Sequence, residues 1–113
     1  MADKGQKQVY EVRAEVLKAM AHPARLQMID AMAEKEMCVC DLAELVDLAV
    51  PTVSRHLKTM KSAGIVTTRR DGNHIYHTLR FPCVTRVFQC IDEVLLSDDE
   101  RAREVCDLIR QSS

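Results

Sequence analysis

The sequence lacks any apolar run approaching the ~20 residues that a membrane-spanning helix needs. It also lacks internal repeats and low-complexity segments. Its opening, MADKGQKQ, is polar and has no apolar stretch typical of a secretory signal. We therefore expect a cytoplasmic protein that makes no use of a membrane. In the reducing cytosol its five cysteines are expected to remain free of structural disulfides.

Net charge of one sign is nearly absent as well, because the formal value is only −1. The distribution is more informative than the sum. Between Leu48 and Ile91 the sole acid is Asp71, whereas seven cations are present: Arg55, Lys58, Lys61, Arg69, Arg70, Arg80 and Arg86. Acidic residues dominate from Asp92 onward. A basic middle between acidic ends indicates a localised surface for a polyanion.

With 113 residues, 47% of them apolar, the chain is expected to form a single domain over residues 1–113. Residues 38–63 read as a helix-turn-helix, ended by Gly64. Its two apolar stripes are Leu42, Leu45 and Val46, then Val53, Leu57 and Met60. The opposite face of the second helix has no acid and carries Ser54, Arg55, Lys58 and Lys61. Such a face suits the DNA major groove. The alternative is an ordinary amphipathic helix with a solvated basic face.

Other helices are expected on both sides of this motif. A first helix over residues 9–20 would have Val9, Val12, Val16, Leu17 and Met20 as its apolar side. The break Ala21-His22-Pro23 precedes a second helix over 23–33, which would bury Leu26, Ile29 and Met32. Residues 38–47 and 51–63 form the third and fourth helices. Ala49 stands where a capping side chain would satisfy open amides. We expect His22 to cap or pack at the second helix.

A β-hairpin is predicted for residues 65–79, with strands at 65–68 and 74–79 around an Asp-Gly turn. It would be the wing of a winged helix. Arg69, Arg70 and His74 would lie near its tip, within reach of phosphates or the minor groove. His77 is expected to be exposed. The alternative for the tip is a solvated polar turn.

A last long helix over residues 82–96 has a broad apolar stripe, and an acidic helix or tail follows over 97–113. The first and last helices together offer more apolar surface than one small core needs. We therefore predict a mainly α fold with a small β-hairpin (α+β), a winged helix-turn-helix that forms a homodimer through helices 9–20 and 82–96. The alternative is a long helix packed within one subunit.

Cys38-Val39-Cys40 opens the third helix. Amides at a helix start favour the thiolate form of cysteine, which binds metals. Two soft thiolates suit soft metals or metalloids. C-x-C alone is a weak signal, and two buried small residues are the alternative.

The run E-M-C-V-C-D-L, residues 36–42, resembles the E-L-C-V-C-D-L signature of the ArsR/SmtB family of metal-responsive repressors. The similarity extends over most of the chain, in A-H-P-A-R-L (21–26), T-V-S-R-H-L (52–57), A-G-I-V (63–66) and R-D-G-N-H-I-Y (70–76). The resemblance implies a dimeric winged-helix repressor that leaves its operator when an inducer binds. In relatives with C-V-C at this place the inducer is As(III), Sb(III), Cd(II) or Pb(II), and the ligand positions correspond to Cys38 and Cys40.

Several departures from the family pattern bear on the inducer. The third cysteine of the best-known arsenite sensors falls on Ala43, and the Asp-x-His pair of zinc and nickel sensors falls on Phe81-Pro82-Cys83. No cysteine precedes Cys38, unlike in the cadmium and lead sensors. A third ligand would come from Cys83, Cys90, Cys106 or solvent. Cys83 and Cys90 are about 10 Å apart along a helix, so at most one completes a given site. The alternative to a ligand is a place in the core for Cys90, and packing in the tail beside Val105 for Cys106.

We predict a repressor that binds double-stranded operator DNA. The residues expected to read or brace the DNA are Thr52, Ser54, Arg55, His56, Lys58, Lys61, Arg69, Arg70 and His74, although His56 could instead contact its own neighbours. As(III)/Sb(III) on Cys38 and Cys40 is the favoured inducer. The alternatives are Cd(II)/Pb(II), or a dithiol that senses redox state or reactive sulfur. A cysteine enzyme would need a base and a pocket that no motif indicates. A pure interaction module would lack salt-dependent DNA binding.

Overall fold

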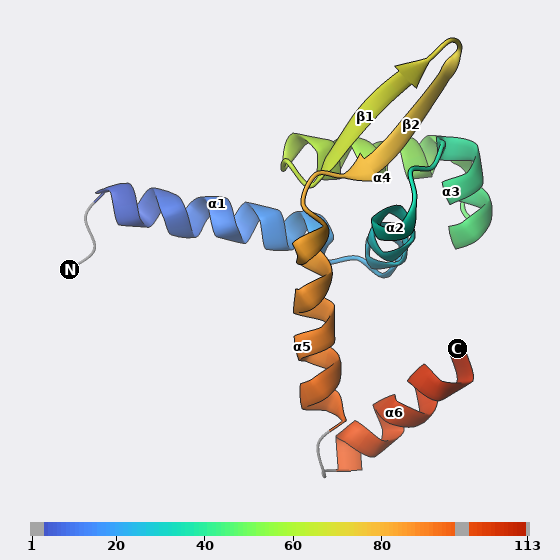
Figure 1. The fold of residues 1–113 in the computed structure, drawn as a ribbon. Helices are drawn as coiled ribbons and strands as arrows, with labels where there is room; N and C mark the ends of the chain where they lie inside the picture. Colours follow the sequence, from blue (N-terminus) through green and yellow to red (C-terminus); the bar gives the residue numbers. More distant parts are fainter. Residues whose placement is uncertain (1–3, 97–99, 113) are drawn as a thin grey trace. The chain divides into compact units, whose positions relative to one another are not determined.

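The computed structural model describes residues 4–96 and 100–112 (Figure 1). The chain divides into two compact units, residues 1–82 and 83–113. The elements are α1 (Lys4–Met20), α2 (Pro23–Glu34), α3 (Val39–Val46), α4 (Val50–Ser62), β1 (Val66–Asp71), β2 (His74–Leu79), a 3-10 turn (Pro82–Val84), α5 (Thr85–Leu95) and α6 (Glu100–Ser112). Among the described helices, none has the length and apolar character needed to cross a membrane. The predicted helices and hairpin are all present.

α1 begins earlier than its apolar stripe indicated, at Lys4. It ends at Met20, where the backbone turns before Pro23. His22 has extended backbone and its Nδ1 accepts the Ala24 N–H at 3.1 Å, so it caps α2 as predicted. Pro23 occupies the first helical position, where its missing N–H leaves no bond unmade. The sequence between α1 and α2 therefore sets both helix ends locally.

Two predicted core positions are wrong. Leu26 is 37% exposed, and Leu45 is 43% exposed. α2 buries Met28, Ile29 and Met32 instead, and α3 buries Leu42 and Ala43. The predicted stripe was built from residues three positions apart. Three residues rotate by about 300°, which is about 60° less than a full turn, so Leu26 and Met32, two such steps apart, point in directions about 120° apart on α2. Neighbours on adjacent elements, not spacing alone, select which arc is buried.

The α3–α4 connection is the turn of the helix-turn-helix. Asp47 ends α3 in the left-handed region (φ 54°, ψ 50°), and its N–H bonds back to the carbonyls of Ala43 and Glu44. Leu48 N–H also bonds to Ala43 O at 3.1 Å, which closes the helix end. α4 then runs to Ser62 and is followed by Gly64 at φ 83°, as predicted for the glycine that ends it.

The hairpin pairs β1 with β2 antiparallel, from Val66 opposite Leu79 to Asp71 opposite His74. The turn is therefore Gly72-Asn73 rather than the predicted Asp71-Gly72, and β1 extends three residues past its expected end at Thr68. Gly72 has φ 62°, whereas Asn73 does not have positive φ. Positive φ at the first turn position alone is the pattern of a type II′ turn, which favours glycine there.

The core lies in the first unit, between α2, α3, α4 and the base of the hairpin (Figure 1). β2 contacts α2 and α3, and β1 contacts α4. None of the side chains assigned as buried in residues 4–96 and 100–112 is polar or charged. The most deeply buried side chains are Met28, Ile29, Met32, Leu42, Val53 and Met60. The α4 stripe of Val53, Leu57 and Met60 is confirmed, and it anchors that helix while leaving its other face in solvent.

The second unit contains α5 and α6, which contact each other. The predicted helix from residue 82 begins as a 3-10 turn and becomes α-helical at Thr85. The predicted start of the acidic segment at residues 97–99 lies outside the described residues. No residue of α5 is buried within the chain, although the helix has a marked apolar side.

Candidate DNA interface and thiol site

The exposed face of α4 carries hydroxyl and cationic side chains. Ser54, Arg55, Lys58 and Lys61 are all exposed, on the side opposite the buried stripe. Arg55 is near Thr52, with Nη2 donating to Oγ1 at 3.5 Å, and its carbonyl accepts the Thr59 hydroxyl at 3.1 Å. Cations on one rigid helical face, without an acid between them, can contact phosphates and base edges in a groove.

His56 lies at the edge of this face and is half-buried. Its Nδ1 accepts the Arg25 Nε–H at 2.9 Å, and its ring centroid is 4.5 Å from that of His22. Arg25 also donates to Ala19 O at 3.3 Å, which ties the end of α1 to this cluster. Burial, followed by the charge of Arg25, lowers the pKa of His56. His56 therefore contacts Arg25 and His22 of its own chain. This is the alternative to a DNA contact that the sequence predicted for His56.

Arg69, predicted to reach DNA from the wing, is engaged within the chain. Its Nε donates to Glu36 Oε2 at 3.0 Å, and its Nη2 contacts the other oxygen of the same carboxylate. Asp71 Oδ2 lies 3.8 Å from its Nη1, and the guanidinium lies 5.0 Å from the centre of the Tyr76 ring. The hydrogen bond from Arg69 lowers the pKa of Glu36.

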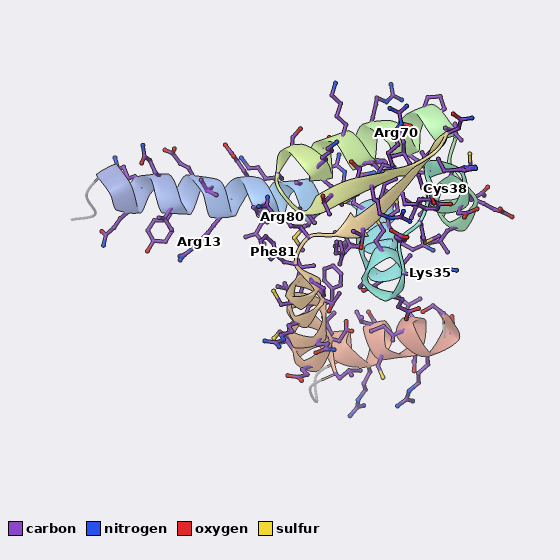
Figure 2. The ribbon with its side chains drawn as sticks, turned by 45° about the horizontal axis from the view of Figure 1, so that its top comes forward. Arg13, Lys35, Cys38, Arg70, Arg80 and Phe81 are labelled. Carbon is purple, nitrogen blue, oxygen red and sulfur yellow. The ribbon has the colours of Figure 1, made fainter. Side chains whose placement is uncertain are left out.

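Three other residues predicted to contact DNA are disposed differently. Arg70 is exposed and lies on the neighbouring position of β1, toward the turn (Figure 2). His74 is exposed at the start of β2. Lys61 extends from α4 toward β1, where its Nζ donates to the Thr68 hydroxyl at 3.3 Å. Successive strand residues point to opposite faces, so Arg69 and Arg70 cannot make the same contact.

Cys38 is the N-cap residue of α3 and lies next to the hairpin (Figure 2), and Cys40 belongs to the first turn of the same helix. Cys38 has extended backbone (φ −82°, ψ 164°) and is half-buried. Cys40 is exposed, and both are free thiols. On a regular helix, two residues separated by one other point about 200° apart around the axis. Cys38 precedes the regular helix, so this separation does not apply to the sulfurs of Cys38 and Cys40. The pair offers two soft donors to a thiophilic ion.

These two thiols would be an incomplete three-ligand site. Within residues 4–96 and 100–112, no three His, Cys, Asp or Glu side chains gather in a way that could hold an ion. Ala43, where a third cysteine would stand, is buried at 6% exposure. Cys83 and Cys90 are exposed in the second unit, and Cys106 is half-buried. The alternative prediction that Cys90 packs in the core is therefore wrong, because its side chain is exposed within the unit of residues 83–113.

Sequence reasoning missed the links around Cys38. Met37 forms an isolated antiparallel bridge with His77, in which the Met37 N–H donates to His77 O and the His77 N–H donates to Met37 O, with N···O distances of 2.9 and 2.7 Å. His77 is half-buried rather than exposed, its Nδ1 has no partner among the described residues, and burial lowers its pKa. Glu36 and Arg69 are 33 residues apart, a separation that no spacing rule connects.

The fold and sequence are similar to those of known regulators. Residues 22–68 match the family described as "Bacterial regulatory protein, arsR family". The chain is 34% identical to the nodulation protein NolR of Rhizobium meliloti over 91% of this chain and 84% of the relative. It is 33% identical to an arsenical resistance operon repressor of Staphylococcus xylosus over 79% and 86%.

Among solved structures, one match is the homodimeric winged helix-turn-helix DNA-binding domain of a possible ArsR-family transcriptional regulator from Mycobacterium bovis. Its TM-score is 0.73 at 30% identity, over 82% of this chain and 86% of that one. The family match over residues 22–68 covers α2, α3, α4 and the start of β1. The chain therefore belongs to the arsR family of bacterial regulatory proteins, with the winged helix-turn-helix fold of its DNA-binding regulators.

Proposed function

We propose that this protein is a cytoplasmic transcriptional repressor that binds operator DNA as a homodimer and is released when a thiophilic inducer binds Cys38 and Cys40. As(III) or Sb(III) is the inducer that we favour. The observation that carries the proposal is the position of two free thiols on the first turn of α3, the helix that directly precedes α4. A ligand on that turn acts on the element that supports the basic face of α4.

The DNA contact is proposed for Ser54, Arg55, Lys58 and Lys61 on α4, with Thr52 bracing Arg55, and for Arg70 and His74 on the wing. Two observations support this assignment. These α4 cations are exposed on one face of a helix whose opposite face is fully buried, so the face is rigid. The helix also lacks an acidic residue throughout its length, so nothing on it repels phosphates.

Dimer formation is supported by apolar surface that each unit leaves in solvent. α1 exposes Val9, Val12 and Leu17, and α5 exposes Val87, Ile91 and Val94. Contiguous exposed apolar side chains on a helix are typical of interaction surfaces. The matched M. bovis domain is described as homodimeric. Two joined copies would present two α4 helices to successive turns of an inverted repeat.

Inducer action requires that the ligand bind the DNA-free form better than the DNA-bound form. A coupling free energy of about 1–3 kcal/mol would correspond to a loss of operator affinity of about 5- to 150-fold. Donors for a third bond to the ion would come from Cys83, Cys90, Cys106, the partner subunit or solvent. Cd(II) or Pb(II) on the same thiols, and a reversible bond between the two sulfurs, are the competing signals.

The test is a fluorescence-anisotropy titration with an operator selected from random DNA by the protein itself. Wild type, Cys38→Ser and Cys40→Ser are measured with and without arsenite, with reductant present. Val39→Ala is the matched control, since it alters the same turn without removing sulfur. We expect arsenite to release wild type and Val39→Ala, and to leave both serine variants bound.

Other outcomes decide between signals. Release by cadmium but not by arsenite would replace the metalloid with a divalent soft metal. Release by oxidant, with a mass loss of two hydrogens reversed by reductant, would favour the dithiol sensor. Retention of arsenite release in both serine variants would contradict the thiol site.

A further inference from the structure

Residues 36–38 connect the thiol site to both strands of the wing. The Glu36 carboxylate forms a two-pronged ion pair with Arg69 on β1. The Met37 backbone exchanges two hydrogen bonds with His77 on β2. Cys38, the next residue, is the N-cap of α3. We propose that residues 36–38 are a strap that holds the wing in its DNA-binding position, and that Arg69 is a positioning residue of the wing rather than a DNA contact. This inference rests on the proposed function, because it assigns the wing a role in operator binding.

The charge around Arg69 argues against a phosphate contact. Two carboxylates already face its guanidinium, from Glu36 and Asp71, so the local sum is −1. A phosphate approaching Arg69 would meet both acids. The Tyr76 ring lies against the guanidinium and occupies one of its faces. Arg70, beside it on the strand, forms no ion pair with any residue in 4–96 or 100–112, so it is the wing cation available to DNA.

The ion pair matters for position rather than for stability. The Arg69 and Glu36 side chains are 51% and 40% exposed, and exposed pairs contribute little to the free energy of folding. A forked guanidinium–carboxylate pair nevertheless fixes two planes relative to each other, which a single-point contact does not. The residue after Glu36, Met37, is held by its backbone bridge to His77. Together these contacts anchor β1 and β2 to two consecutive residues, Glu36 and Met37.

The strap gives the inducer a route to the wing. Cys38 has extended backbone because it caps α3, and its neighbours on the N-terminal side are the strap residues. A ligand that draws the sulfurs of Cys38 and Cys40 together must reorient this first turn. Any such movement is passed directly to Glu36 and Met37, since no flexible linker intervenes. The wing would then shift at the same time as α3.

Operator binding without inducer tests the strap, using Glu36→Gln and Arg69→Gln with Arg70→Gln as the matched control. Removal of an acid should by simple electrostatics tighten DNA binding, and a freed Arg69 would tighten it further if it were a phosphate contact. For Glu36→Gln the strap predicts the opposite sign, a weakening of about 3- to 10-fold. It predicts a similar weakening for Arg69→Gln, for which the salt dependence separates a lost link from a lost phosphate contact. The double variant should be no weaker than either single variant, because both remove the same link.

The salt dependence provides a second readout. Arg69→Gln should leave the slope of log affinity against log salt unchanged, whereas Arg70→Gln should make it shallower by about one for each phosphate that the variant no longer neutralises. The charge-swapped pair, Glu36→Arg with Arg69→Glu, should recover much of the affinity despite placing an acid on the wing. Circular dichroism verifies that each variant is folded. Tighter binding by Glu36→Gln, a shallower slope for Arg69→Gln, or no recovery in the swap would overturn the proposal.

These measurements use no inducer, so they separate the strap from the thiol site. Absence of DNA binding by wild type would contradict the proposed function itself. Normal operator binding without any arsenite response would contradict the inducer and leave the strap result standing. Arsenite added to Glu36→Gln then tests the route, which predicts that the fold-change in affinity on induction is smaller than in wild type.

Discussion

The N-terminus of α4 provides a prediction in which stability and DNA affinity change in opposite directions. Ala49 is the N-cap residue and has the extended backbone of a cap (φ −64°, ψ 144°), but it has no side-chain oxygen. Val53 N–H already bonds to Ala49 O at 3.1 Å, and Pro51 has no N–H. The amides of Val50 and Thr52 are therefore the open donors at this helix end. Ala49→Asp would place a carboxylate where it can accept the Thr52 N–H.

The expected gain in the free energy of unfolding is about 1 kcal/mol, the usual value of an N-cap side chain. The helix dipole favours the negative charge by a further ~0.3–1 kcal/mol at low salt. If the open amides bind a DNA phosphate, the same carboxylate occupies the donor and repels the phosphate. A loss of ~1.4 kcal/mol at each half-site corresponds to about 10-fold, and about 100-fold for a dimer.

Urea unfolding followed by circular dichroism measures the first effect, at equal protomer concentration because dimer formation adds to stability. An unchanged slope and a midpoint raised by roughly 0.5 M would agree with the cap. Operator anisotropy measures the second effect. Ala49→Ser is the control for charge, because its neutral hydroxyl can cap α4 and occupy the same amide without repelling the phosphate. Stabilisation together with unchanged or tighter DNA binding by Ala49→Asp would refute the phosphate contact, and no stabilisation would refute the open-amide argument.

Three further predictions concern stability. The pKa values of His56 and His77 are lowered, first by burial, so the unfolded chain binds more protons than the folded chain as the pH falls below about 6.5. The stabilising effect of the two neutral rings is complete above about pH 6.5 and declines as the pH falls toward the lower folded-state pKa values. The urea midpoint should therefore be lower at about pH 5.5 than at about pH 7.5, and this decrease should be smaller in the double variant His56→Gln with His77→Gln. Met60→Ala removes a fully buried side chain and should lower the free energy of unfolding by about 2–5 kcal/mol, measured by the same urea assay, with a normal midpoint contradicting the core assignment. Asp47→Gly relieves a left-handed backbone and should raise the melting temperature slightly, against the larger unfolded-state entropy of glycine; a large decrease would mean that the Asp47 side chain itself holds the turn.

The sequence determined the local features of this protein. His22 before Pro23 indicated a cap and a helix start, Gly64 indicated the end of α4, and the buried stripe of α4 followed from its periodicity. Each of these depends on residues close together along the chain. The positions of Cys38 and Cys40 at a helix start were predictable for the same reason.

Only the tertiary structure decided which predicted groups meet. Leu26 and Leu45 satisfied a helical spacing but lie outside the arcs that neighbouring elements cover. Arg69 was a free cation in the sequence and is a paired one in the fold, since Glu36 is brought to it from 33 residues away. A linear pattern carries periodicity and caps, whereas the partner of a charge is fixed by how distant segments pack.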